Sequence, residues 1–295
     1  MDPRHVLVLT AAEGVGDAAG AAARSALRDA GLDAAPPRRL AATALEIDVA
    51  GPLPAGFAPA ALLPGAPFDA NLVPADDRRK RLLVADMDST IIGVECIDEL
   101  ADFAGVKAQV AAITERAMQG ALDFEGALEA RVALLAGLPE TALAETYAER
   151  VRLTPGARTL VRTMAALGAA TALVSGGFDW FTARVAAEAG FAAHRANRLE
   201  VADGRLTGRV ARPILGREAK REALLDLAAA AGLAPRDAVA VGDGANDLAM
   251  VRAAGLGVAW RARPALAAAA DARLDRSDLT AVLALQGIPE AEWRA

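Results

Sequence analysis

The chain has 295 residues, of which 54% are hydrophobic and 24% charged, with a formal net charge of -6 and a pI of about 5.2. This composition excludes a disordered chain and fits a globular protein of about two domains, and its acidic balance argues against nucleic-acid binders, which normally carry a basic patch. Prolines interrupt the longest uncharged stretch, 49–68, and Cys96 is the single cysteine, so we expect a cytoplasmic protein with neither a membrane helix nor an intrachain disulfide.

The first part of the chain predicts a small α/β domain. Its apolar patterns indicate a strand at 5–10, a helix at 17–30 and an extended segment at 43–49. The proline-rich run that follows, together with the charged cluster DDRRK at 76–80, is typical of a linker. We therefore divide the chain into an N-terminal domain at 1–76, a candidate regulatory unit, and a catalytic domain at 77–295.

After the linker, the pattern changes to short apolar runs that each end in a polar loop. Such near-continuous runs are typical of parallel strands covered on both faces. The runs lie at 82–86, 170–175, 238–243 and 256–260. Helical patterns lie between or after them, at 155–167, 179–189, 217–231 and 246–254. This alternation predicts the α/β class with a doubly wound parallel sheet, and it places the ligand site at the carboxyl ends of the strands.

One connection in this sheet is too long to be a simple crossover. The segment 94–152 contains four amphipathic helical patterns, at about 97–104, 107–119, 123–136 and 139–150. We interpret it as a helical cap inserted into the core domain. Further along, two alternating runs around a glycine-containing turn at 196–210 predict a β-hairpin.

The first apolar strand ends in the sequence Asp86-Met87-Asp88-Ser89-Thr90. Asp, Ser and Thr also favour turns and helix N-caps, so the motif alone fits a polar turn as well. Two carboxylates at the exit of a buried strand can instead divide the work of catalysis. One then attacks as a nucleophile while the other moves protons.

The third strand continues into Gly242-Asp243-Gly244-Ala245-Asn246-Asp247, which brings two more carboxylates to the same sheet edge. The glycines permit a tight turn that holds an acid against its neighbour. Taken alone, this stretch fits a surface loop. Together with the first motif it indicates a site for a hard divalent cation, and Mg²⁺ prefers such oxygen ligands.

Two further features fit a phosphate site. The second strand ends in Ser175-Gly176-Gly177, whose hydroxyl and backbone amides could cradle phosphate oxygens, particularly where a helix follows. Such a triplet is also a common turn. Lys220 is one of few lysines in an arginine-rich chain. Its alternative role is that of a solvated helix residue, but a lysine that reached the carboxylates would offset their charge.

The four motifs, in this order and each on its expected element, resemble the haloacid-dehalogenase-like superfamily of phosphatases. Flanking stretches such as GVECIDELAD, ANRLEV and VGDGANDLAM make the chain similar to the phosphoserine phosphatase family. The resemblance covers about 81–285, with every catalytic motif intact. The N-terminal 75 residues show no such clear match.

The resemblance implies Mg²⁺-dependent hydrolysis of phosphoserine, the last step of serine biosynthesis. It implies that Asp86 is the nucleophile and Asp88 the acid and base. It assigns the metal to Asp86, the Asp88 backbone carbonyl and Asp243, with Asp247 in support, and the phosphoryl oxygens to Ser175, Gly176 and Lys220, with Asn246 nearby. In the cap, it places Glu95 and Arg131 on the substrate's ammonium and carboxylate, and Met118 and Phe124 on the pocket wall. The expected partner is thus a small phosphorylated amino acid, and a homodimer is compatible with this assignment.

Two alternatives remain open. Receiver domains of signalling proteins also gather acids, a hydroxyl and a lysine at the strand ends of a doubly wound sheet. They need neither the second aspartate of D-x-D nor an inserted cap, and both features favour an enzyme. Within the enzyme class, the alternative is a related phosphatase or phosphotransferase that acts on another small phosphorylated metabolite, such as phosphothreonine or homoserine phosphate.

Overall fold

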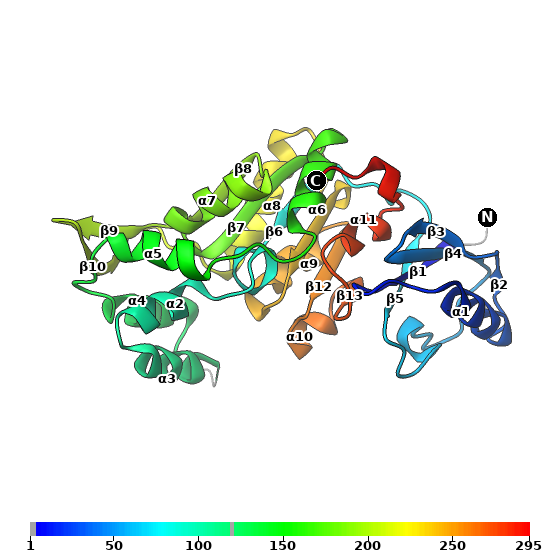
Figure 1. Cartoon of the computed structure of the whole chain (residues 1–295), viewed down its shortest axis with the longest axis horizontal. Coiled ribbons are helices and arrows are strands. Elements are labelled where there is room, and N and C mark those ends of the chain that lie inside the picture. Colours follow the sequence, from blue (N-terminus) through cyan, green and yellow to red (C-terminus); the bar gives the residue numbers. More distant parts are fainter. Residues whose placement is uncertain (1–3, 119–120) are drawn as a thin grey trace.

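The computed structural model of the protein describes residues 4–118 and 121–295. It is elongated, with a small N-terminal sheet at one end, a larger sheet in the middle and a helical cap at the other end (Figure 1). The predicted α/β class with a doubly wound parallel sheet is confirmed. Within the described ranges, no helix combines the length and the apolar character that crossing a bilayer requires.

The central sheet has six strands in the order β13-β12-β11-β6-β7-β8, and every neighbouring pair is parallel. Their bounds are β6 Leu82–Ala85, β7 Ala170–Phe178, β8 Ala193–Asn197, β11 Ala238–Gly242, β12 Leu256–Trp260 and β13 Ala272–Leu274. The chain runs outward from β6 through β7 to β8 and then returns to the opposite side of β6 as β11. This reversal opens a crevice beyond the carboxyl ends of β6 and β11, where such folds bind ligands.

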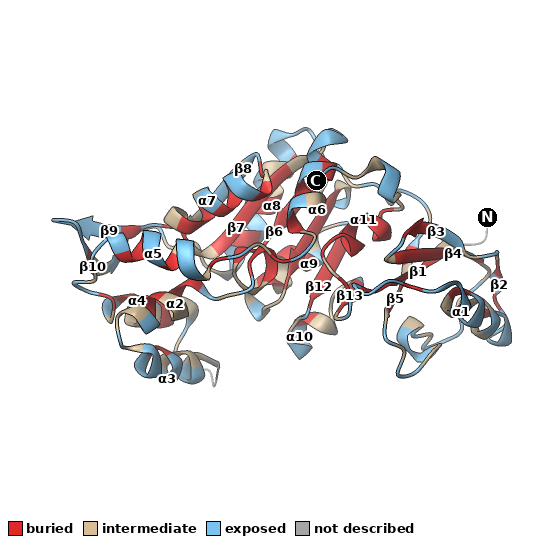
Figure 2. Cartoon of the chain, in the orientation of Figure 1, coloured by how far each residue is buried: buried red, intermediate tan, exposed pale blue. Residues whose placement is uncertain are grey.

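Both faces of the central sheet are buried, which explains the near-continuous apolar runs of its strands (Figure 2). Leu83 and Val241 point into one core layer, and Leu82 and Ala240 into the other. The first layer is covered by α6 Ala157–Ala166, α7 Asp179–Ala189 and α11 Ala281–Leu285. The second is covered by α8 Arg217–Ala230, α9 Leu248–Ala253 and α10 Pro264–Ala267.

The predicted helical cap is present between β6 and α6. It comprises α2 Cys96–Phe103, α3 Lys107–Met118, α4 Phe124–Ala133 and α5 Thr141–Arg150. The chain enters and leaves the cap side by side, because Ile92 forms an antiparallel bridge with Leu153. The predicted hairpin is formed by β9 Leu199–Ala202 and β10 Arg205–Val210, and β10 packs on α4. The hairpin therefore extends the cap, a relation that its sequence did not indicate.

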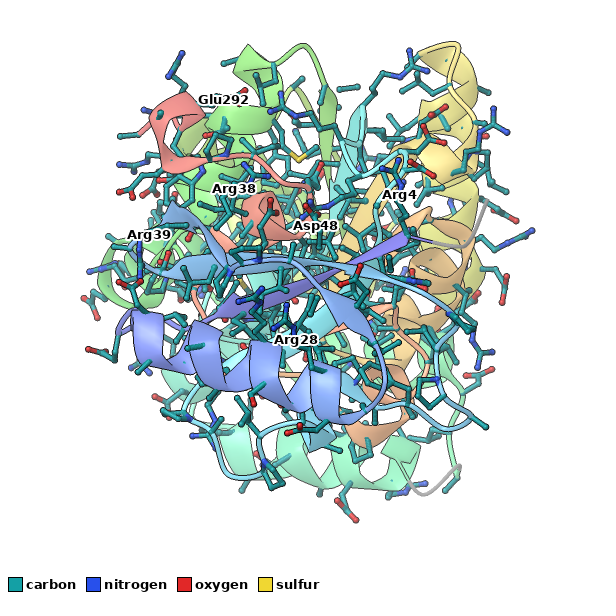
Figure 3. The ribbon with its side chains drawn as sticks, turned by 90° about the vertical axis from the view of Figure 1, so that its right-hand side faces the viewer. Arg4, Arg28, Arg38, Arg39, Asp48 and Glu292 are labelled. Atoms are coloured by element: carbon teal, nitrogen blue, oxygen red, sulfur yellow. The ribbon has the colours of Figure 1, made fainter. Side chains whose placement is uncertain are left out.

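The N-terminal part forms an antiparallel sheet in the order β2-β4-β1-β5, with β3 also paired to β4. The bounds are β1 Arg4–Thr10, β2 Asp33–Ala34, β3 Arg38–Ala41, β4 Ala44–Ala50 and β5 Asp69–Pro74. Helix α1 Asp17–Asp29 covers the outer face, where Leu7, Leu27 and Ile47 pack together (Figure 3). Val6 and Val8 belong to the other face and pack in the same core as Val282 of α11. Residues 6–9 of β1 are all apolar because the sheet is covered on both sides.

Side chains of β5 join this sheet to the exposed edge of the central one. The Asn71 side chain donates to the carbonyl of Arg273 at 2.9 Å and accepts from its amide at 2.8 Å. The buried Asp69 carboxylate accepts from the amides of Asp275, Arg276 and Ser277 and from the Ser277 hydroxyl, at 2.6–3.1 Å. These bonds satisfy backbone groups that the edge strand β13 and the loop after it would otherwise expose.

The sequence reasoning missed a strand between the proline-rich run and the charged cluster. Residues 69–74 form β5, and Arg78 of the charged cluster is hydrogen-bonded to α11. Its guanidinium donates to Glu46 at 3.0 Å and to the carbonyls of Ala284 and Leu285 at 3.1 and 3.2 Å. The polar residues Asp69 and Asn71 concealed the strand because they face inward, toward a partner that lies far away in the sequence.

Candidate active site

The crevice beyond β6 and β11 collects the predicted acidic residues. Asp86 directly follows β6, and its amide donates to the carbonyl of Val241 in β11 at 2.9 Å. Asp243 directly follows β11. Because the two strands pair in parallel and in register, both aspartates arrive at the same sheet edge.

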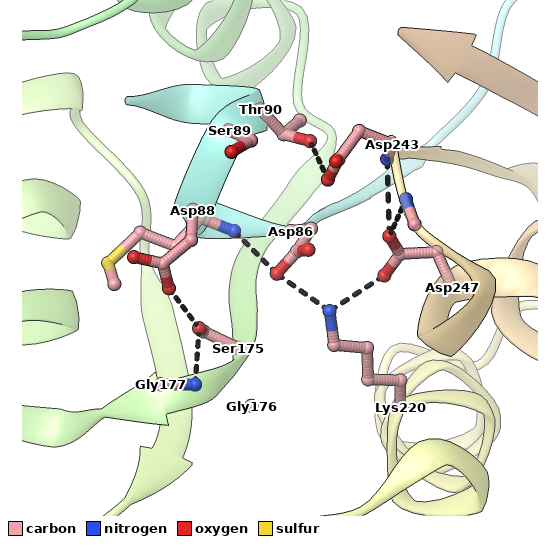
Figure 4. Close-up of polar contacts among 12 residues, drawn as sticks. Asp86, Asp88, Ser89, Thr90, Ser175, Gly176, Gly177, Lys220, Asp243 and Asp247 are labelled. Carbon is pink, nitrogen blue, oxygen red and sulfur yellow. Dashed lines mark hydrogen bonds and ion pairs between the residues drawn. The ribbon is translucent and has the colours of Figure 1, made fainter. Parts of the chain in front are cut away.

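Lys220 of α8 lies buried between two of the carboxylates (Figure 4). Its ammonium is 2.6 Å from Asp86 Oδ1 and 2.7 Å from Asp247 Oδ1. Burial alone would lower the pKa of Lys220, but Asp247 and Asp86 outweigh burial and raise it. The lysine therefore carries a full positive charge, and it is not the solvated helix residue that its sequence position also allowed.

Asp247 is held beneath the loop that carries Asp243. Its Oδ2 accepts from the amides of Asp243 and Gly244 at 3.2 and 3.0 Å, while Oδ1 takes Lys220. A Cβ atom at Gly242 would lie 2.4 Å from the Asp247 carboxyl carbon, so only glycine fits there. The glycine of G-D-G thus makes room for the carboxylate that orders the turn.

The cluster carries more negative charge than Lys220 can neutralise. Asp86, Asp243 and Asp247 each offer an oxygen, and these oxygens lie within 4.8 Å of one another. Burial, followed by repulsion from Asp247, raises the pKa of Asp86, and the same two causes raise the pKa of Asp243 to about 6. Three oxygen donors at this separation, whose negative charge is not fully compensated, fit a small divalent cation.

Asp88 projects toward β7. Its Oδ1 accepts from the Cys96 amide at 2.8 Å, and its Oδ2 accepts from the Ser175 hydroxyl at 3.0 Å. Burial raises its pKa, although the hydrogen bonds from Cys96 and Ser175 oppose the rise. A raised pKa suits a group that must first give and then take a proton.

The triplet Ser175-Gly176-Gly177 lies at the end of β7, which continues to Phe178, and α7 starts at Asp179 as predicted. A break in the β7–β8 register lies in this stretch, so its backbone is not held throughout by regular pairing. A Cβ atom at Gly177 would lie 2.7 Å from Asp88 Oδ2. Glycine therefore lets the strand approach the second aspartate closely.

A cavity of about 410 Å³ opens from these acids into the cap. Glu95, Phe124 and Arg131 line its cap side. Burial and the nearby Asp88 raise the pKa of Glu95 to about 7. Burial also lowers the pKa of Arg131, a shift that Asp98 and Glu95 oppose. An acid and an arginine, both partly withdrawn from water, thus face one chamber.

Most of the predicted site residues meet in this chamber. Its lining includes Asp86, Asp88, Glu95, Phe124, Arg131, Ser175, Gly176, Asp243 and Asn246. Lys220 and Asp247 lie buried behind Asp86, as the ion pairs above show. The side chain of Met118, predicted for the pocket wall, lies outside the part of the chain that the structure describes.

Three residues that the sequence reasoning did not assign to the site also belong to it. The Thr90 hydroxyl donates to Asp243 at 3.3 Å, the Ser89 hydroxyl donates to Glu95 at 2.7 Å, and the Cys96 amide holds Asp88. The hydroxyls of D-x-D-S-T were a visible signal for the first two. Their partners lie on other segments, which the sequence could not bring together.

The chain is similar to known proteins in both sequence and structure. A family model described as haloacid dehalogenase-like hydrolase matches residues 83–252. Phosphoserine phosphatase SerB2 of Mycobacterium tuberculosis is 49% identical over 218 residues, which are 74% of this chain and 53% of that protein. The chain thus spans about half the length of that relative.

Two solved structures are also similar. The first is the HAD family hydrolase t0658 of Salmonella enterica serovar Typhi, with a TM-score of 0.84, 31% identity and coverage of 96% of this chain and 98% of that one. The second is a phosphoserine phosphatase with a phospho-aspartyl intermediate analogue, with a TM-score of 0.65, 41% identity and coverage of 70% and 98%. The chain belongs to the haloacid dehalogenase-like hydrolase family and, within it, to the phosphoserine phosphatases.

Proposed function

We propose that the protein hydrolyses O-phospho-L-serine to L-serine and phosphate through an aspartyl phosphate on Asp86. The observation that carries the proposal is the chamber itself. Asp86 and Asp88 lie at its floor, and Glu95 and Arg131 at its cap side. A phosphate placed on the floor would leave the amino-acid end of the substrate facing the cap. We place this reaction in the cytoplasm, as the last step of serine biosynthesis.

The residues divide the reaction between them in two steps. An Asp86 carboxylate oxygen attacks phosphorus, and the bond from phosphorus to the serine oxygen breaks while Asp88 gives that oxygen a proton. Asp88 then takes a proton from water, which attacks phosphorus and releases phosphate with Asp86 restored. Ser175, Gly176 and Lys220 hold the phosphoryl oxygens, and Asn246 stands close to them at the rim. Such transfer depends mainly on positioning and on charge stabilisation.

The acidic cluster is suited to Mg²⁺. Asp86 and Asp243 would hold the ion with the Asp88 carbonyl, and Asp247 would support them from behind. When bound, the ion offsets the negative charge of the carboxylates and of the phosphoryl group. Lys220, whose ammonium lies 2.6 Å from Asp86, supplies further positive charge.

Metal removal gives the first prediction. In excess EDTA we expect phosphate release to be lost, and added Mg²⁺ should restore it. Mg²⁺ should also raise the melting temperature, because a ligand that binds only the folded protein stabilises it. Ca²⁺ should inhibit, since it accepts more ligands at longer distances. Full activity in chelator, together with a melting temperature that does not respond to Mg²⁺, would contradict this assignment.

The second prediction concerns the substrate's carboxylate and ammonium. Arginine donates two parallel hydrogen bonds to a carboxylate, and removal of one partner of a buried charged contact costs about 2–5 kcal/mol. Arg131→Ala should therefore lower the ratio of kcat/KM for phosphoserine to that for p-nitrophenyl phosphate by at least tenfold. Glu95→Gln should lower the same ratio, because its ammonium partner is also absent from p-nitrophenyl phosphate.

Arg209→Ala, on the exposed face of β10, is the matched control and should leave the ratio unchanged. If both substrates lose activity equally in Arg131→Ala, the arginine supports the cap and does not read the substrate. A phosphate-release screen that includes phosphothreonine and homoserine phosphate tests the wider assignment. Preference for either of these over phosphoserine would replace the proposed substrate.

A further inference from the structure

The turn that carries the catalytic aspartates also contacts the first residues of the cap. Two neighbouring pairs of residues are involved. The Cys96 amide donates to Asp88 at 2.8 Å, and the Ser89 hydroxyl donates to Glu95 Oε1 at 2.7 Å. In one bond the turn donates to the cap entry, and in the other the cap entry donates to the turn. The residues involved are neighbours in sequence on both sides.

Ser89 adopts an unfavourable backbone conformation in this turn. Its φ of 56° and ψ of 1° lie in the left-handed region, which is unfavourable for residues other than glycine. Its amide donates to the carbonyl of Val94 at 3.2 Å, and the Ile92 amide donates to the carbonyl of Met87 at 3.0 Å, so the loop closes on itself. Strain of this kind persists where the surroundings enforce it, often at functional sites.

Glu95 is the N-cap residue of α2, but its side chain makes no capping hydrogen bond. Its carboxyl group instead takes the Ser89 hydroxyl on Oε1 and lines the chamber. Among the described residues, those that line the chamber do not include Ser89. The serine therefore reaches a ligand only through Glu95.

We propose that Ser89 is a positioning residue for recognition of the substrate's ammonium. Its hydroxyl holds Oε1 of Glu95, which leaves the second carboxylate oxygen to accept from the ammonium. An otherwise free glutamate would have to give up rotamer freedom each time substrate bound, and the serine removes that cost beforehand. Because Ser89 follows Asp88 directly, it also fixes the distance between Glu95, which binds the ammonium, and Asp88, which transfers the proton.

The test rests on the proposed function and uses a matched pair of ligands. 3-Phosphoglycerate has the carbon skeleton of phosphoserine with a hydroxyl in place of the ammonium. We would measure KM for phosphoserine and the inhibition constant of 3-phosphoglycerate in wild type, Ser89→Ala, Ser89→Gly, Glu95→Gln and Ser89→Ala/Glu95→Gln. Loss of the preorganisation of one long side chain suggests a rise in KM of roughly 2- to 10-fold.

In Ser89→Ala we expect KM for phosphoserine to rise by roughly 2- to 10-fold, and by a larger factor than the inhibition constant of 3-phosphoglycerate. Ser89→Gly should show the same loss of discrimination, although glycine relieves the backbone strain. In the Glu95→Gln background, Ser89→Ala should add little, because the residue through which it acts is already altered.

Three results would overturn the inference. The first is an equal rise of KM for phosphoserine and of the inhibition constant of 3-phosphoglycerate in Ser89→Ala. The second is a wild-type ratio of these two constants in Ser89→Gly. The third is a full additional rise of KM when Ser89→Ala is added to Glu95→Gln. The proposed function fails in a different way, because wild type would then not distinguish phosphoserine from 3-phosphoglycerate, and the inference would fall with it. If wild type and Glu95→Gln behave as expected while Ser89→Ala keeps the wild-type ratio of KM for phosphoserine to the inhibition constant of 3-phosphoglycerate, only the role of Ser89 is refuted.

Discussion

Asp86→Asn is expected to abolish phosphate release and formation of the phosphoenzyme while leaving the protein folded. An amide cannot serve as the attacking carboxylate, and loss of a covalent nucleophile typically lowers kcat by about four orders of magnitude or more. The fold should tolerate the change well. Burial and Asp247 raise the pKa of Asp86, which means that its ionised form is disfavoured in the folded protein without metal. A neutral side chain removes that repulsion, so the melting temperature in chelator should stay level or rise.

The measurement combines phosphate release with mass spectrometry of acid-quenched protein. Wild type mixed with substrate should show a population heavier by one phosphoryl group, and the variant should not. Asp29→Asn, at the exposed end of α1, is the matched substitution and should behave as wild type. Turnover by Asp86→Asn near the wild-type rate would show that another residue is the nucleophile.

Lys220→Met should produce the second large loss. The substitution keeps the length of the side chain but removes a buried charge that lies 2.6 and 2.7 Å from two carboxylates. Removal of one preorganised donor of this kind typically lowers kcat by about 100- to 1000-fold. Breaking a buried ion pair also destabilises a protein by about 3–5 kcal/mol, because it leaves uncompensated charge behind.

Stability should depend on the metal more strongly in Lys220→Met than in wild type, since a bound cation then provides the positive charge that remains near the cluster. Melting temperatures with and without Mg²⁺, alongside initial rates, would test this. Lys107→Met is the control, because that ammonium is largely exposed and 3.8 Å from Asp102. If Lys220→Met retains wild-type rates, the lysine is a structural counter-ion without a part in phosphoryl transfer.

The sequence predicted the central sheet and the acidic floor of the site because both depend on local patterns. Apolar runs that end in D-x-D-S-T and G-D-G-x-N-D place Asp86 and Asp243 at strand ends whatever the rest of the chain does. The helical cap was equally visible, as an insertion too long for a crossover. These features need only the period of each segment and the geometry of parallel strands.

Features that depend on distant partners could not be predicted in this way. Strand β5 was hidden because Asp69 and Asn71 look like loop residues until Arg273 and Ser277 satisfy them. The contribution of the β9–β10 hairpin to the cap was hidden for the same reason. Ser89 was visible in its motif, but its role depends on the orientation of Glu95, which only the folded turn shows.

The side-chain hydrogen bonds from β5 join parts of the chain that are synthesised far apart in time, so they can form only late in folding. Asn71 and Arg273 are 202 positions apart, and the hydroxyls of Thr10 and Ser277, which lie 2.7 Å apart, are separated by 267. A ribosome delivers the N-terminal sheet first, but its inner face has no permanent cover until α11 has been made. Contacts of such long range form late and slow folding. Substitutions at Asp69 or Asn71 should therefore reduce the yield of folded protein during expression, while the molecules that do fold retain a normal active site.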